Sequence, residues 1–445
     1  MMDENWQDKL RRLGVVKGTR NLKPAPPVKS DQFSVVSDQS PTHHSSLTPD
    51  HSLDVLLPGL ELVEANDSAC YVLDKVYPLA YRHGQDRLAD LLAYGVGDKP
   101  ALSGDRKSLA EVAVYLQDSR LNNLNFHDFL FLDTETTGLA GAGTIAFMVG
   151  VAFFDGEALV VRQYFLRDFG DEPAMLHLLD ELLAEKAGLV TFNGRTFDLP
   201  LLDTRYLMNR MPGRVQSVPH IDLLQPSRRL WRARFGSVAL GNLEQNLLGL
   251  QRTHEDVPGF LIPGLYHDYL RSGDGRDLLR VFYHNEIDML SMVTLATRVT
   301  RLLTQPDPGD HPIDRYSLGK WQAALGLMEQ SEQNLRFAAQ GDLPLDLYHQ
   351  ALFELSWLLK RNGRHPEAVS LWQQIAATTF DDVTAHVELA KYYEWHELDL
   401  VAAIRWTEQA LTLSQSWSQG QAALARDELE HRMNRLQRKW GGENA

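Results

Sequence analysis

Short, mainly apolar runs that end in polar turns are the first regular pattern along the chain. Residues 129–132 form such a run, and its length and aromatic content predict a buried strand. Residues 144–154 are again strand-like and follow several glycines, so we expect a second strand after a hairpin. A compact run over 189–192 ends in Asn193-Gly194, a strong turn signal, and predicts a third strand.

Apolar residues at helical spacing predict the helices that follow these strands. Leu199, Leu202 and Tyr206 recur at this spacing, so a helix should start near Thr196. Residues 277–303 contain neither proline nor glycine. Their apolar positions have a broadly helical period, which predicts one long helix.

Acidic side chains stand where these elements begin or end. Asp133 and Glu135 are two residues apart on an extended chain, so their side chains leave on one face, roughly 6 to 7 Å apart. This spacing suits a shared pair of cations. Asp198 should lie in the first turn of its helix, where the macrodipole favours an anion. Taken alone, Asp198 would be interpreted as a helix-terminal charge without chemistry.

The long helix carries a histidine and an aspartate on one side. His284 and Asp288 are separated by four positions, so both can face a single site, whereas Tyr283 lies about 140° from Asp288 on an ideal helix. A surface hydrogen bond would explain the pair in isolation. Its occurrence after the two other acidic segments favours a common metal-binding site instead.

Three segments match the motifs of a known family: Asp133-Thr-Glu135, Asn193-Gly-Arg-Thr-Phe197-Asp198 and His284-Asn-Glu-Ile-Asp288. In these motifs the chain resembles the DEDD exonuclease branch of the ribonuclease H-like superfamily, and more closely its YprB-type members, which join such a domain to helical repeats. The resemblance covers about residues 60–305. It implies an α/β fold, a ribonuclease H-like mixed sheet flanked by helices, followed by an all-α tetratricopeptide-like helical repeat domain.

The resemblance also implies a mechanism. Asp133, Glu135, Asp198 and Asp288 would hold two Mg²⁺ or Mn²⁺ ions, which activate a water for hydrolysis of a phosphodiester. The usual family substrate is a terminal nucleotide attacked from its 3′ end. We therefore expect a 3′–5′ exonuclease whose partner is single-stranded DNA or RNA. A non-catalytic scaffold for nucleic acid or protein on the same fold, and a structure-selective endonuclease, are the alternatives.

The motif in the long helix departs from the family pattern. His284 stands four residues before Asp288, the spacing of the tyrosine subclass, and Tyr283 stands five before it, the spacing of the histidine subclass. We favour His284 as the catalytic residue because a neutral imidazole accepts a proton at neutral pH, whereas tyrosine could only orient a water. Tyr283, Asn193 and Asp222 are candidates for supporting positions behind the metal ligands, and a structural role is the alternative for Asp222.

Cations and aromatic residues are interleaved between residues 228 and 235, as in proteins that bind single strands. The candidates for nucleic-acid contacts are Thr136, Arg228, Arg229, Arg232 and Arg234. The equally good alternative is a surface helix with Trp231 and Phe235 packed into the core.

Composition and repeats divide the rest of the chain. Residues 1–50 are basic and rich in proline and serine, which predicts a disordered tail, either an arm for nucleic acid or an inert segment. Residues 51–125 predict a β-containing extension, and residues 126–305 the exonuclease domain. From 313 to 440, helical segments recur at a period of about 35 residues and resemble tetratricopeptide repeats. Stacked repeats would present a concave surface to a protein partner. They would bury Trp357, Trp372, Tyr392 and Trp406.

Charge and cysteine content narrow the setting. The formal net charge of −15 argues against a broadly basic surface, but not against a nuclease, because bound cations reverse the local field. The single cysteine, Cys70, excludes an intramolecular disulfide and favours a reducing compartment. No apolar run has the length of a membrane span, and the first residues lack a signal-peptide pattern. We expect a soluble, cytoplasmic protein without a membrane partner.

Overall fold

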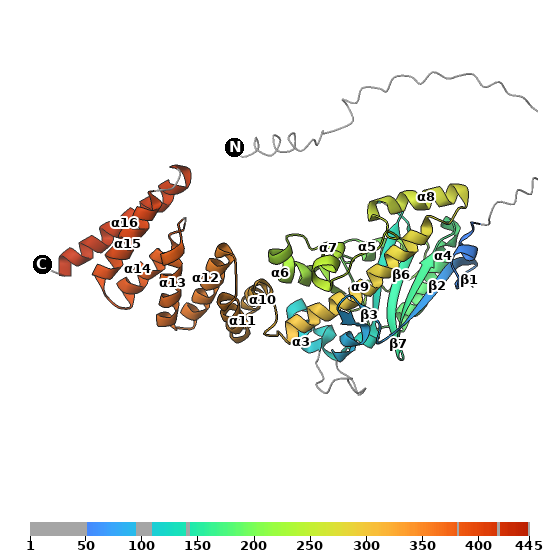
Figure 1. Ribbon diagram of the computed structural model, residues 1–445, viewed down its shortest axis with the longest axis horizontal. Coiled ribbons are helices and arrows are strands. Elements are labelled where there is room, and N and C mark those ends of the chain that lie inside the picture. The colour runs from blue at the N-terminus through green and yellow to red at the C-terminus, as the bar shows by residue number, and fades with distance from the viewer. Residues whose placement is uncertain (1–50, 95–108, 139–142, 381, 416–418, 444–445) are drawn as a thin grey trace, which may run out of the picture. The chain divides into compact units, whose positions relative to one another are not determined.

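The computed structural model describes residues 51–94, 109–138, 143–380, 382–415 and 419–443 (Figure 1). The tail predicted for residues 1–50 lies outside these residues. The described chain begins with a mixed sheet flanked by helices and continues as a series of helices. The predicted order, an α/β region followed by an all-helical region, is therefore confirmed.

Seven strands form one mixed sheet in the spatial order β1-β2-β7-β6-β5-β8-β9. Their bounds are β1 Leu60–Ala65, β2 Ser68–Pro78, β5 Phe129–Thr136, β6 Ala146–Asp155, β7 Ala158–Phe165, β8 Gly188–Thr191 and β9 His220–Asp222. Neighbours from β1 to β5 are antiparallel, whereas β5, β8 and β9 run parallel to one another. The strands predicted from apolar runs are β5, β6 and β8, and they are adjacent.

Residues 51–125, predicted as a separate extension, supply two strands to this sheet. β2 pairs with β7 from Tyr71 opposite Phe165 to Pro78 opposite Ala158. The extension and residues 126–305 therefore share one sheet. The other elements of this part are α2 Leu53–Leu56, β3 Arg82–His83, β4 Asp86–Arg87, η2 Leu88–Ala93, α3 Leu109–Leu116, η3 Ser119–Asn123 and η4 Phe126–Asp128.

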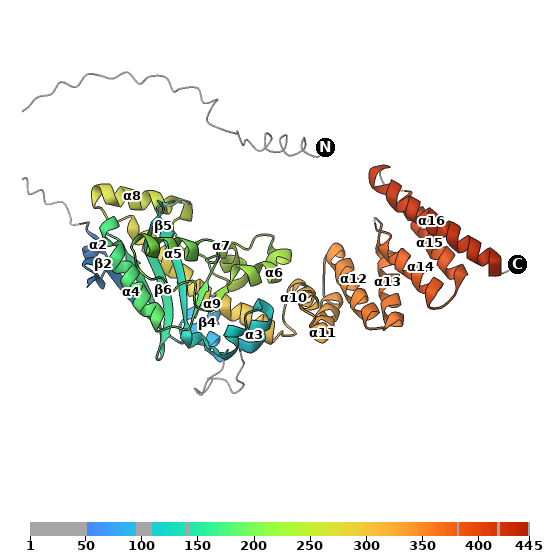
Figure 2. The same ribbon diagram turned by 180° about the vertical axis from the view of Figure 1, so that it is seen from behind.

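Helices cover both faces of the sheet (Figures 1 and 2). Their bounds are α4 Glu172–Ala184, α5 Asp198–Met208, α6 Leu224–Phe235, α7 Leu240–Leu243, α8 Ile262–Ser272 and α9 Leu278–Thr304, with shorter turns η5 Phe169–Asp171, η6 Glu244–Leu248 and η7 Gly259–Leu261. Alternate residues of β5 enter two hydrophobic clusters. Leu130 and Leu132 pack with α4, α5 and α8, whereas Phe129 and Phe131 pack with α6 and most of α9.

The long helix α9 contributes to both clusters. Its first turns add Leu278 and Phe282 to the cluster of α4, and its residues from Met289 onward belong to the cluster of α6. The intervening segment carries His284 and Asp288. These two side chains therefore lie where the clusters meet.

The described residues after α9 form seven helices. They are α10 Pro312–Leu325, α11 Met328–Gln340, α12 Leu345–Arg361, α13 His365–Thr378, α14 Thr384–Trp395, α15 Leu400–Ser414 and α16 Gln419–Glu443. The first six pack as successive pairs. The segments predicted to recur, 331–338, 368–376 and 403–410, lie in α11, α13 and α15, the second helix of each pair.

Two tryptophans predicted to be buried in these helices differ. Trp372 is 1% exposed and donates a hydrogen bond to Ser356 at 2.8 Å. The prediction for Trp357 was wrong, because this side chain is 40% exposed. The ammonium of Lys360 lies 4.7 Å from its ring centroid. A neighbouring cation of the same helix thus covers part of this ring.

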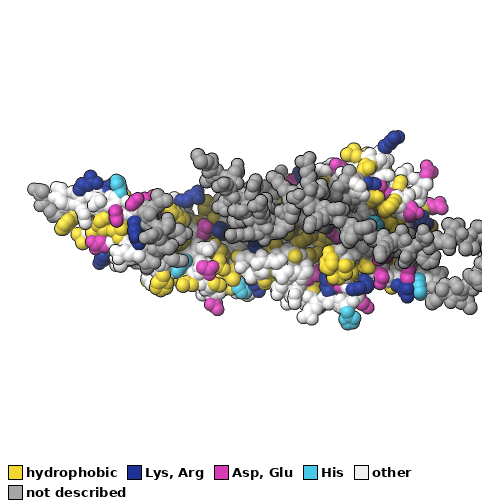
Figure 3. All heavy atoms as spheres, turned by 90° about the horizontal axis from the view of Figure 1, so that it is seen from above, with side chains coloured by type: hydrophobic (Ala, Val, Ile, Leu, Met, Phe, Trp, Pro, Cys, Tyr) yellow, Lys and Arg dark blue, Asp and Glu magenta, His cyan; other side chains and the backbone are white. Residues whose placement is uncertain are grey.

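The surface carries charges of both signs. Where Figure 3 shows described side chains, Lys and Arg are interspersed with Asp and Glu. A nucleic-acid contact is therefore to be sought in a local cluster of cations. Within the described ranges, no helix combines the length and the apolar character needed to cross a membrane.

Candidate active site

β5 presents two carboxylates on the face that packs against α9. Asp133 and Glu135 alternate with the buried Thr134 and Thr136, so their side chains leave the strand on one face, as their spacing predicted. Asn285 of α9 donates a hydrogen bond from Nδ2 to Oδ2 of Asp133 at 3.3 Å. This contact connects the strand carboxylates to the helix that carries the last acidic residue.

Asn285 is oriented by the sheet. Gln163 of β7 donates from Nε2 to Oδ1 of Asn285 at 3.0 Å, which leaves Nδ2 of Asn285 directed at Asp133. Gly150 of β6, the partner of Asp133 across the sheet, gives the room for this arrangement. A Cβ atom at Gly150 would stand 2.0 Å from Oδ1 of Asn285. The position of Asn285 therefore requires glycine at residue 150.

Asp198 is the first residue of α5, within the first turn where the sequence predicted it. Its side chain is 3% exposed and accepts a hydrogen bond from Oγ1 of Thr134 at 2.5 Å. Asp222 shapes the preceding turn, because its carboxylate accepts the backbone N–H groups of Asn193 at 2.8 Å and Arg195 at 3.1 Å. Both oxygens of Asp222 thus accept hydrogen bonds from backbone N–H groups, and its charge contributes to the raised pKa of Asp198.

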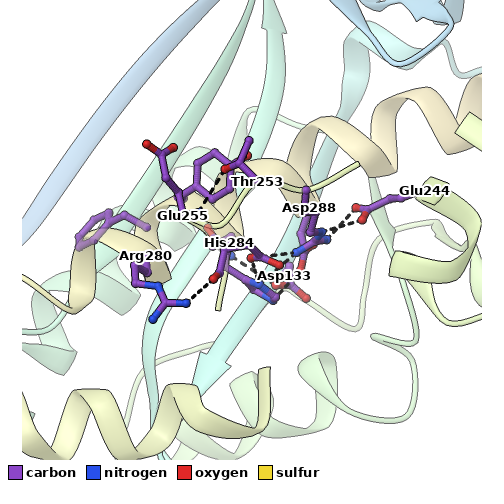
Figure 4. Close-up of polar contacts among 12 residues, drawn as sticks. Asp133, Glu244, Thr253, Glu255, Arg280, His284 and Asp288 are labelled. Carbon is purple, nitrogen blue, oxygen red and sulfur yellow. Dashed lines mark hydrogen bonds and ion pairs between the residues drawn. The ribbon is translucent and has the colours of Figure 1, made fainter. Parts of the chain in front are cut away.

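His284 and Asp288 lie on one side of α9, near Asp133 (Figure 4). Nε2 of His284 is 3.5 Å from Oδ2 of Asp288. Glu135, His284 and Asp288 each offer one ligand atom, and these atoms all lie within 4.8 Å of one another. The hydroxyl of Tyr283 instead accepts a hydrogen bond from Thr253 at 3.3 Å. The two residues predicted to position the water thus differ in their contacts: His284 lies beside Asp288, and Tyr283 contacts Thr253.

Burial and mutual repulsion raise the pKa values of these carboxyl groups. Burial raises the pKa of Asp133 well above its usual range, and the charges of Asp198, Asp288 and Glu135 raise it further. Burial likewise raises the pKa of Glu135, with contributions from Asp288 and Asp198, and it raises the pKa of Asp198 to about 6. The four carboxylates therefore gather closely enough to disfavour simultaneous ionisation. A cluster of oxygen donors with one imidazole suits a hard divalent cation.

Arg252 belongs to a network that the sequence did not predict. Its guanidinium donates to Glu244 from Nε at 2.6 Å and from Nη2 at 2.7 Å, and it also donates to Asp288. Glu244 is 1% exposed and forms a fixed anchor. Burial raises the pKa of Asp288, whereas Arg252 and His284 lower it. Arg252 stands in an irregular segment after η6, where no periodic pattern marks it.

Asp256 is a second contact that the sequence did not reveal. Its Oδ1 lies 2.7 Å from Nδ1 of His284, while Nη1 of Arg252 lies 3.0 Å from the same nitrogen. A carboxylate only accepts and a guanidinium only donates, so one state of Nδ1 cannot satisfy both. The shorter contact favours an N–H at Nδ1 that donates to Asp256. Nε2, which faces Asp288, then keeps its lone pair.

Two of the four arginines predicted to contact nucleic acid face the helical region. The guanidinium of Arg229 lies 5.1 Å from the ring centroid of Trp321 in α10. Arg234 donates to Asp314 of α10 at 2.7 Å. These contacts connect α6 to the helical region. The other two, both exposed on α6, are Arg228 and Arg232.

The remaining candidates for nucleic-acid contacts are engaged within the fold. Trp231, 1% exposed, belongs to the core beneath α6, and Phe235 packs partly buried against it. These aromatic residues therefore pack into the core, as the alternative interpretation of a surface helix predicted. The buried Thr136 donates from Oγ1 to the main-chain oxygen of Gly138 at 2.7 Å. Its hydroxyl thus stabilises the end of β5.

Comparisons with known proteins place the part of the chain that carries these residues in a known superfamily. Residues 130–300 match the model of the RNase_H superfamily. The chain is 30% identical over 396 residues to the uncharacterized protein YprB of Bacillus subtilis (strain 168), and the match covers 86% of this chain and 89% of that protein. The superfamily match runs from β5 into α9 and contains all four carboxylates.

Proposed function

This chain belongs to the YprB family of the RNase H superfamily, and on this premise we propose that it is a metal-dependent 3′–5′ exonuclease of single-stranded nucleic acid. One observation carries the proposal: ligand atoms of Glu135, His284 and Asp288 lie within 4.8 Å of one another. Asp133 and Asp198 add two further carboxylates whose charges interact with those of this cluster. The polarity of attack and the single-stranded substrate rest on the family resemblance.

The ligands proposed for two Mg²⁺ or Mn²⁺ ions are Asp133, Glu135, Asp198 and Asp288. When bound, such ions activate water and stabilise the leaving oxygen in an in-line displacement. The chain favours their binding, because burial and repulsion make the ionised carboxylates unstable without a cation. Arg252 contributes one positive charge at Asp288. It does so from a position fixed by the buried Glu244.

His284 takes the proton from the attacking water at Nε2. Asp256 supports this role by accepting a hydrogen bond from Nδ1, which keeps the lone pair on the nitrogen that faces Asp288. The arrangement follows the logic of an aspartate that orients a catalytic histidine. Tyr283 is not assigned this proton transfer, because a neutral tyrosine is a poor base at neutral pH; its hydroxyl accepts a hydrogen bond from Thr253.

Digestion of labelled oligonucleotides tests the activity. Single-stranded DNA and RNA carrying a label at the 3′ or the 5′ end are incubated with the full chain in Mg²⁺, Mn²⁺ or EDTA. We expect mononucleotides to be released from the 3′ end in either metal and none in EDTA. A circular single strand should stay intact, since it has no end; its cleavage would indicate an endonuclease.

Asp133→Asn is the test variant and Asp155→Asn its matched control. Both remove one negative charge, but Asp155 is exposed at the opposite end of the neighbouring strand β6. The control should cleave like the wild type. Cleavage that persists in Asp133→Asn, or a wild type inactive with every substrate and metal, would overturn the proposal.

The repeat-like helices α10–α15 provide a surface for a protein partner, which we propose as their role. Exposed aromatic side chains in this region, Trp357 at 40% and Trp395 at 56%, are candidates for such a contact. The buried, unpaired Cys70 fits the reducing environment of the cytoplasm, where we propose that the protein acts.

A further inference from the structure

A groove of about 590 Å³ opens between α6 and the end of β8. Leu224, Arg228 and Arg232 line one wall, and because they are spaced by four residues they share one face of α6. Residues 236–240 form the return wall. Gly236 ends α6 with a φ of 70°, a left-handed conformation that lets the chain reverse there. Phe192 and Asn193 close the inner end.

The inner end of the groove adjoins the candidate active site. β8 runs parallel to β5 with Val190 opposite Phe131, so extending this register by two residues places Phe192 beside Asp133. Phe192 packs against the cluster that contains Phe131, which is the sheet face from which Asp133 emerges. The groove therefore starts at the edge and on the face of the sheet where the carboxylates gather.

The charge of the groove differs from that of the whole chain. The sequence has 59 acidic and 44 basic residues, yet the lining residues include two arginines and no aspartate or glutamate. Arg228 and Arg232 are exposed. Among the residues that the structure describes, neither guanidinium forms an ion pair or a hydrogen bond, whereas Arg234 of the same helix is paired with Asp314. The charges of Arg228 and Arg232 are therefore available to bind an anionic ligand.

We propose that this Arg228–Arg232 groove binds the single-stranded segment that leads into the active site. Its two arginines lie about 6 Å apart along α6 and contact phosphates of one strand. Phe192 offers apolar surface to a base. The volume lies in the range of about 300 to 1,000 Å³ that pockets for single small ligands have, which is enough for part of one strand. The inference rests on the proposed function, and it identifies the surface along which the substrate strand reaches the active site.

Binding is measured by fluorescence anisotropy with 5′-labelled single-stranded DNA and RNA of about 12 nucleotides. The full chain carries Asp133→Asn throughout, so that no probe is cleaved, and KCl is varied. The test variant is Arg228→Gln with Arg232→Gln. The matched control is Arg361→Gln with Arg405→Gln, two exposed helical arginines in α12 and α15. Thermal unfolding confirms that both variants fold, as expected for exposed positions.

Losing two phosphate contacts should lower the slope of log K against log salt by about 1.4 and weaken binding roughly 10- to 30-fold at about 0.1 M salt. The control should keep the affinity and the slope of its parent. If the test variant binds like the control, the groove is not the binding site, even when the wild type degrades oligonucleotides. If binding depends on the two arginines but the wild type cleaves nothing, the groove assignment stands and the proposed hydrolysis fails.

Discussion

In the helical region, the carboxylate of Glu394 is fully buried and surrounded by cations from α16. It accepts hydrogen bonds from Arg435 at 2.6 Å and Lys439 at 2.7 Å, and Arg432 lies 3.4 Å away. In the candidate active site, the one hydrogen bond that the described residues give to the side chain of Asp133 comes from the neutral Asn285. Glu394 thus has several counter-ions, whereas Asp133 has none among the described residues.

The pKa values of two buried carboxyl groups, Glu388 and Asp133, differ in the same way. Although burial raises it, hydrogen bonds from Lys360 and Lys391 bring the pKa of Glu388 in α14 below its usual range. In the site, burial and neighbouring carboxylates raise the pKa of Asp133. In the first arrangement the fold itself supplies the counter-ions, whereas the ionised form of the second becomes favourable when a cation from solution binds. Glu388 and Asp133 thus represent two different environments for a buried carboxylate.

The largest expected effect is that of Asp133→Asn on activity. Turnover should fall to background, because the substitution removes a proposed metal ligand. The melting temperature in EDTA should stay equal or rise, since one of four repelling charges is removed. Oligonucleotide cleavage and differential scanning fluorimetry measure the two effects. A large loss of stability would show that Asp133 stabilises the fold as Glu394 is expected to do, which would contradict the difference between the two regions.

His284→Ala should lower the rate roughly 10² to 10⁴-fold, as expected for loss of a catalytic base. Tyr283→Phe should leave the rate near that of the wild type, because the tyrosine hydroxyl contacts Thr253 and is not the proposed base. Single-turnover kinetics at saturating Mn²⁺ separate the chemical step from binding. If Tyr283→Phe is the more damaging change, the tyrosine positions the water and His284 does not.

Glu394→Gln should lower the free energy of unfolding by about 3 kcal/mol, the lower end of the cost of breaking a buried ion pair. The lower end applies because its cations stay partly exposed. Glu408→Gln, at an exposed position of α15, is the control and should change little. Urea denaturation followed by tryptophan fluorescence measures both. Equal stabilities of the two variants would show that the cations around Glu394 contribute nothing.

The last expected effect, which does not exceed that of Glu394→Gln, is a pH dependence of opposite sign in the two regions. The pKa of Asp198 is raised to about 6. Between about pH 4 and 6 the unfolded chain has lost this proton while the folded chain keeps it, so the free energy of unfolding falls as pH rises, by at most about 3 kcal/mol.

Asp198→Asn should remove this fall when urea denaturation in EDTA is compared across the window. Glu388→Gln should instead remove stability that is present above the unfolded-state pKa and is lost as pH decreases, because the folded pKa of Glu388 is lowered. If both variants shift the profile in the same direction, the two regions do not handle their charges differently.

Local patterns predicted the parts of the site that belong to regular elements. The apolar run before Asp133, the turn before Asp198 and the helical period around Asp288 each report the conformation of a few neighbouring residues. Arg252 and Asp256 could not be found in this way. Their contacts join an irregular segment to α9 more than twenty positions away, and only the folded chain brings those parts together.

Nonlocal pairing explains the other differences. The sequence indicated a strand near Tyr71. That this strand joins the main sheet depends on its pairing with β7, which is distant in the sequence. Helical period placed Trp357 and Trp372 in the repeat-like helices, yet which of the two is covered depends on how the helix pairs stack. Periodicity marks an apolar face, and the neighbours available to it decide whether each side chain is buried.

Gly150 has a consequence for mutational screens. Alanine there would push Asn285 away from Asp133, because the added carbon would overlap the amide oxygen. Such a variant should lose metal affinity while every ligand, base and cation of the site is still encoded. A list of functional side chains would not include Gly150, because glycine has no side chain. The arrangement of Asn285 and Asp133 therefore depends on the absence of a side chain at residue 150.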